Sequence, residues 1–79
     1  MKGKSWCEKL NRMERDRGGL VRAAPGKNRI VFTVQAPDRV AALREIAGAA
    51  FAAGCVLDMD GASVLDSGRG IFTAFIEAE

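Results

Sequence analysis

The sequence contains no histidine and no tyrosine, and only two of its 79 residues are cysteine. Without histidine no Ser-His or Cys-His nucleophilic pair can form, and acid–base chemistry would fall to carboxylates, lysine or cysteine. Two cysteines are also too few for a zinc site, which takes four nitrogen or sulfur ligands. Composition therefore favours a binding protein over an enzyme, and we expect no catalytic residue, no metal and no cofactor.

Long apolar runs are missing as well. None approaches the ~20 residues needed to span a bilayer, and residues 1–6 are basic without the apolar stretch of a secretion signal. We therefore expect a cytoplasmic protein without membrane contacts. So short a chain forms one domain at most and buries only ~60% of its unfolded surface, so its core is thin and a partner subunit would stabilise it.

The two cysteines, Cys7 and Cys55, are too far apart for a CxxC motif. A disulfide between them is one interpretation. Because nothing else indicates an oxidising compartment, we predict instead that both thiols pack as small apolar side chains.

Positive charge is concentrated near the N-terminus. Residues 1–29 contain nine Lys or Arg against three acids, whereas residues 30–79 contain three against seven. The basic segment could contact nucleic acid or an acidic protein surface. A solvated helix with interleaved charges explains it as well, and the strands lack the paired aromatics of an RNA-binding sheet. We favour the solvated helix and do not expect nucleic acid as a partner.

A capping box formed by Ser5 and Glu8 predicts a helix over residues 6–17. Its apolar stripe is narrow, and a helix this short is marginal alone. Trp6 and Leu10 must therefore dock, either on the rest of this chain or on a partner, where tryptophan is a frequent anchor.

Several segments have the alternation or composition of strands. Residues 29–35 give the strongest pattern, and residues 20–24 a weaker one that the turn at 25–28 would join to it as a hairpin. A second hairpin turn, 66–70, precedes the strand 71–77. That last strand is apolar on both faces, which predicts a central position in the sheet.

The most regular helical pattern covers residues 39–53, with Asp38 as its cap and Gly54 at its end. We expect it to bury a three-turn apolar stripe against the sheet. That stripe comprises Val40, Leu43, Ile46, Ala47, Ala50 and Phe51.

Residues 55–60 are predicted to form a further strand, interrupted at Gly61 and continued over 62–65. Asp58 and Asp60 would share one face of it. Such a pair could hold a cation or a substrate amine. We favour a polar strand edge that discourages aggregation.

Together these elements predict an α+β fold with an antiparallel, ferredoxin-like sheet and both helices on one face. Residues 29–79 form a βαββ unit with the strand order 55–65, 71–77, 29–35. Residues 1–28 either complete the sheet as part of a circularly permuted αββαββ domain or leave 29–35 as a bare edge that could pair with a second chain. Candidate interface residues are Trp6, Leu10, Val31, Thr33, Ile71 and Phe75.

The segment from Ile30 to Glu77 resembles the ACT domain, the small ligand-binding regulatory module of amino-acid metabolism. Residues 38–43 (Asp-Arg-Val-Ala-Ala-Leu) stand where ACT domains commonly read Asp-Arg-Pro-Gly-x-Leu. Residues 53–58 are similar to the entry to the family's second strand, and residues 70–76 to its third.

The resemblance implies a non-catalytic regulatory module that binds an amino acid or related metabolite at a subunit interface. The ligand-binding residues it implies are Asp38, Arg39, Val40, Ala41 and Asp58. A helix N-terminus attracts anions and Arg39 could bind one, although Asp38 as a simple cap would compete with it. Ala41 departs from the family's glycine. We expect a homodimer or larger assembly; the alternative is an accessory subunit that docks on an enzyme through its sheet edge or basic helix.

Overall fold

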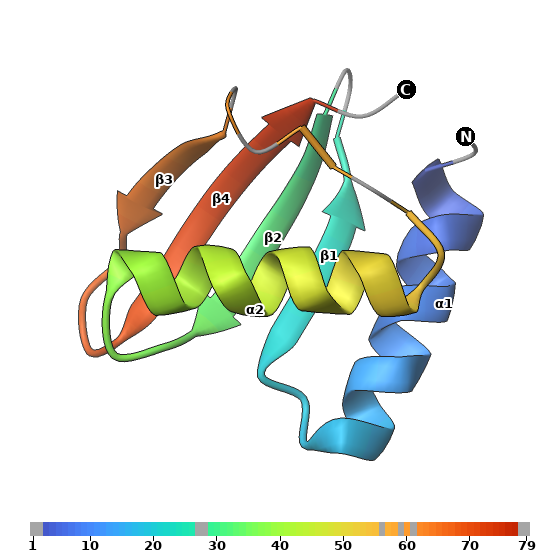
Figure 1. Cartoon of the computed structure of the whole chain (residues 1–79), viewed down its shortest axis with the longest axis horizontal. Helices are drawn as coiled ribbons and strands as arrows, with labels where there is room; N and C mark the ends of the chain where they lie inside the picture. Colours follow the sequence, from blue (N-terminus) through green and yellow to red (C-terminus); the bar gives the residue numbers. More distant parts are fainter. Residues whose placement is uncertain (1–2, 27–28, 56, 59, 61, 78–79) are drawn as a thin grey trace.

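The computed structural model describes residues 3–26, 29–55, 57–58, 60 and 62–77. Six elements follow one another as helix, two strands, helix and two strands (Figure 1). They are α1 (Gly3–Arg17), β1 (Val21–Pro25), β2 (Arg29–Gln35), α2 (Arg39–Ala52), β3 (Ser63–Asp66) and β4 (Ile71–Glu77). No helix within these described residues is long and apolar enough to cross a membrane.

The four strands form one antiparallel sheet in the order β1-β2-β4-β3. β4 therefore lies between β2 and β3, as its apolar faces predicted. α1 and α2 both pack on one face of this sheet. The arrangement is compatible with a ferredoxin-like α+β fold in which the last helix–strand pair comes first in the sequence, so the permuted prediction is confirmed and β1 covers the edge of β2.

Side-chain alternation along the strands determines which residues form the core. Ile30, Phe32 and Val34 of β2 are buried beneath the helices, as are the even-numbered residues of β4. α1 contributes Trp6 and Leu10 to the same core, and the Trp6 ring meets the Phe32 ring edge to face at 5.9 Å between centroids. The N-terminal helix is thus a structural part of this domain.

The buried face of α2 differs from the predicted one. Ile46 and Ala50 are buried as expected, but Val40 is 61% exposed and Phe51 75% exposed, so the predicted stripe was wrong at both ends. Alanines 42 and 49 occupy the sheet side instead. Because this helix is alanine-rich nearly all round, its pattern does not fix which face turns inward, and small side chains allow the closest approach to the sheet.

Two further predictions were wrong. α1 begins at Gly3, so Ser5 lies inside the helix and does not cap it. Of residues 55–60, those described do not form a strand, and the edge strand is limited to Ser63–Asp66. Cys55 and Leu57 pack against the core from a loop. Met59 and Gly61 lie outside the described residues.

The cysteines pack against the core, as predicted, and no disulfide joins them. Cys7 is buried in α1, and this burial raises the pKa of its thiol above the ordinary value. The side chain therefore behaves as a small apolar group.

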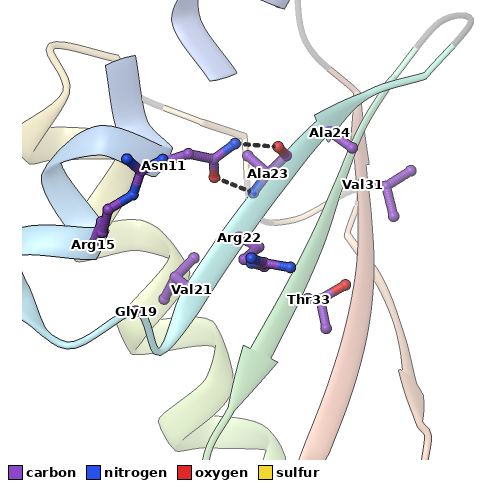
Figure 2. A pocket seen from close by; sticks show the side chains of 9 residues that line it. All are labelled: Asn11, Arg15, Gly19, Val21, Arg22, Ala23, Ala24, Val31 and Thr33. Atoms are coloured by element: carbon purple, nitrogen blue, oxygen red, sulfur yellow. Dashed lines mark hydrogen bonds between the residues drawn. The ribbon is translucent and has the colours of Figure 1, made fainter. Parts of the chain in front are cut away.

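The free edge of β1 is closed by a side chain of α1. The Asn11 Nδ2 donates to the Ala23 carbonyl oxygen at 2.9 Å, and the Ala23 N–H donates to Asn11 Oδ1 at 2.8 Å (Figure 2). One carboxamide thus satisfies both backbone groups that a further strand would use at this position. Pro25, at the end of the same strand, has no N–H to offer. This edge is protected against strand addition.

We predict that Asn11→Ala lowers the free energy of unfolding by about 1–2 kcal/mol, because two hydrogen bonds at a half-buried position are lost. Urea unfolding followed by circular dichroism measures the loss. Arg12→Ala, at the exposed neighbouring position, is the control and should change stability by less than about 0.5 kcal/mol. Equal effects of the two substitutions would contradict the role of Asn11.

Candidate functional site

A hollow lies between the start of α2 and the edge strand β3. It is lined by Pro37, Asp38, Arg39, Val64, Asp66 and Phe72. The backbone brings these elements together at the start of β4, where the Ala36 N–H donates to the Gly70 carbonyl oxygen at 2.8 Å. Gly70 has φ 76°, and a Cβ there would lie 3.0 Å from the Ala36 carbonyl oxygen, so glycine is needed at this junction.

The polar residues of this hollow carry both signs of charge. Asp38 caps α2, its Oδ1 accepting the Ala41 N–H at 2.8 Å, and so neutralises part of the helix terminus. Arg39 is exposed beside it. Across the hollow, Asp66 Oδ1 accepts the Gly68 N–H at 2.8 Å and thereby holds the hairpin turn. Val64 and Phe72 supply apolar surface between the charges, an arrangement suited to a small zwitterion.

The sequence predicted part of this hollow. Asp38 and Arg39 line it, whereas Val40 projects into solvent and Ala41 packs partly against the core. Asp58 is not among its lining residues: it lies in the loop after α2, where its Oδ1 accepts the Asp60 N–H at 3.1 Å. The predicted strand face shared by these two acids was therefore wrong.

Asp66 is the charged lining residue that the sequence prediction of a ligand site missed; Pro37, Val64 and Phe72 were not predicted to line it either. Its place in a hairpin turn explained it as a turn residue, and that role is real. Only the register of β3 against β4 brings it beside α2.

A second candidate surface, the uncovered face, is the side of the sheet that no described helix covers. Odd-numbered residues of β2 and β4 point to it, among them Val31, Thr33, Ile71 and Phe75, as the sequence predicted. β3 adds Leu65, which is 58% exposed. The other two candidate interface residues, Trp6 and Leu10, are buried in this chain's own core and are not available to a partner.

The uncovered face has an apolar and hydroxyl-bearing centre, with charge at one end and at Arg22 of the edge strand β1, which lies opposite Thr33. Val31 lies opposite Phe75, and Thr33 opposite Thr73, in the central two strands. Arg29 lies opposite Glu77 at the end of these strands, and its guanidinium stands over the Phe75 ring at 5.6 Å. This distribution resembles that of protein interfaces, in which an apolar centre is surrounded by polar residues.

A larger, open hollow follows the outer edge of β1 (Figure 2). Arg15 and Asn11 lie on α1, on one side of the strand, whereas Val31 and Thr33 lie on its other side. Because the lining residues are divided by β1 itself, they do not converge on one ligand. Asn11, moreover, is engaged by Ala23.

Among the described residues, no group of three or more acidic or cysteine side chains is placed to hold a metal ion. Comparison of the chain with protein-family models, curated proteins and solved structures finds no match.

Proposed function

We propose that this chain is a non-catalytic regulatory module that acts through assembly, with its uncovered sheet face packed against another protein surface. A small amino-acid-like effector binding beside the start of α2 is the second part of the proposal. It is the arrangement that the resemblance to ACT domains implies.

The uncovered face carries the proposal of assembly. In a two-layer domain the outer face of an antiparallel sheet is commonly polar, with apolar residues turned to the core. Here Val31, Ile71, Phe75 and Leu65 lie on the outer side. Apolar side chains on such a face, as at the neighbouring Val31 and Phe75, typically mark an interaction surface. The protected edge of β1 also supports assembly through the uncovered face. Strand addition at that edge is disfavoured, so the face is the larger surface left for association.

Assembly through this face predicts that the wild-type protein self-associates and that Val31→Lys weakens the association at least tenfold, since a charge would be buried at the centre of the contact. Sedimentation velocity across a range of protein concentrations measures this.

The matched control is Val40→Lys, which changes an exposed valine of α2 on the other side of the domain. It should leave the association unchanged. Circular dichroism establishes that both variants fold. A wild-type chain that stays monomeric at every concentration would refute self-association and leave docking on a larger enzyme as the form of assembly.

The effector proposal rests on the paired charges of the hollow. Arg39 can bind a carboxylate, and Asp66 offers its second carboxylate oxygen to an ammonium group, with Phe72 beneath the ligand's side chain. The hollow is open, and Asp38 already occupies a backbone donor of the helix terminus, so the affinity expected is weak, on the order of 0.1–1 mM.

We predict that at least one of the common amino acids raises the melting temperature when added well above its dissociation constant. Arg39→Ala should abolish that shift, because the carboxylate loses its counter-charge. Arg44→Ala, on an exposed position of the same helix outside the hollow, should retain it. Absence of any shift at 10 mM ligand would refute effector binding while leaving the assembly proposal standing.

A further inference from the structure

The arrangement of residues on the uncovered face indicates how two copies of the chain would pair. Register places Arg29 beside Glu77, Val31 beside Phe75 and Thr33 beside Thr73 across the two central strands. Arg29 and Glu77 form no ion pair with each other within the described part of the chain, and the Arg29 guanidinium turns over Phe75 instead. Both charges at this end of the face are thus available to a facing surface.

We propose that two copies of this chain pack face to face about a two-fold axis that runs parallel to the strands, between β2 and β4. Such an axis places each β2 over β4 of the other copy. Arg29 then faces Glu77 of the partner subunit, and the symmetry repeats this ion pair, so the single contact occurs twice. Val31 likewise meets the partner's Phe75 at the apolar centre. The inference rests on the proposed assembly through this face.

The charges select this axis over the alternative. A two-fold axis across the strands would place Arg29 over the partner's Gln35 and Glu77 over the partner's Ile71. Each charge would then be covered without an opposite charge, and the hydration that each group loses would oppose this arrangement. Packed sheets lie ~10 Å apart and are aligned to within about 30°, a gap that an arginine and a glutamate together can span.

The size of the face makes these charges decisive. Four strands of up to seven residues give a footprint of roughly 20 Å by 20 Å, or about 400 Å² per copy. Specific interfaces of standard size bury about 800 Å² per partner, so this contact is at the small end and should be micromolar in strength. In so weak a pair, two reversed charge contacts shift the equilibrium visibly.

The test exchanges the charges between two variants. Arg29→Glu alone and Glu77→Arg alone each set like charges against each other twice, and each should weaken self-association on the order of tenfold or more. An equimolar mixture of the two variants should form a heterodimer, because each facing pair is again oppositely charged. Native mass spectrometry identifies the heterodimer by its mass, and sedimentation velocity gives its dissociation constant.

The mixture distinguishes contacts between chains from contacts within one chain. Each variant carries two like charges on its own sheet, and mixing leaves that repulsion unchanged. A heterodimer therefore reports the charge pairs between the two chains. Arg44→Glu and Glu45→Arg, two exposed neighbours on α2, are the matched controls and should self-associate like the wild type. Arg29→Gln and Glu77→Gln should also weaken association, but by a smaller factor than the charge reversals. They replace the charge-reversal variants if a reversal disturbs folding. Added salt should weaken the wild-type dimer.

Two results overturn the inference in different ways. If the wild type dimerises but neither variant weakens it, or the mixture stays monomeric, the two-fold arrangement is refuted and pairing by the β3 edge or another axis takes its place. A wild type that never dimerises refutes the pairing together with the proposed self-association.

Discussion

The edge-to-face contact of Trp6 with Phe32 ties the N-terminal helix to the middle of the sheet, and most of the fold depends on it. A buried tryptophan removes about 200 Å² from water, worth ~5 kcal/mol. Its indole N–H makes no hydrogen bond within the described residues, a cost of about 1–3 kcal/mol. The free energy gained by burying Trp6 exceeds the cost of its unpaired N–H, so α1 stays packed on the sheet. Once α1 is in place, Asn11 reaches the edge of β1, and both helices are committed to one face of the sheet.

The sequence predicted the topology because the strongest signals were local and periodic. Alternation in residues 29–35 and apolar character on both faces of 71–77 placed these strands side by side at the centre. The turn over 25–28 and the hairpin over 66–70 then left few ways to arrange the rest. Asp38 was also predictable, since the cap of a helix depends on residues within one turn of it.

Other features depended on contacts that no local pattern contains. Alternation at Cys55 and Leu57 is typical of a strand, yet a loop packed on the core partly buries the same two side chains. The pairing of Asn11 with Ala23 joins residues twelve positions apart through the approach of α1 to an edge. The orientation of α2 could not be predicted for a different reason. Where alanines lie on most sides of a helix, the face that lets the helix come closest to the sheet is the one buried, and Phe51 then lies on the exposed side.

The two proposed sites share the strand β3. Val64 and Asp66 line the hollow beside α2, whereas Leu65 between them is exposed on the other face, because side chains alternate along a strand. β3 is a four-residue edge strand whose sheet neighbour is β4, whereas β1 at the other edge is also hydrogen-bonded to Asn11 of α1. Of the two edge strands, β3 is therefore the less constrained in position. An effector that binds the dimer more tightly than the monomer must, by linkage, strengthen dimerisation by the same factor. In this fold such coupling would need no long pathway, since Asp66 at the hollow and Leu65 on the uncovered face are adjacent residues of β3.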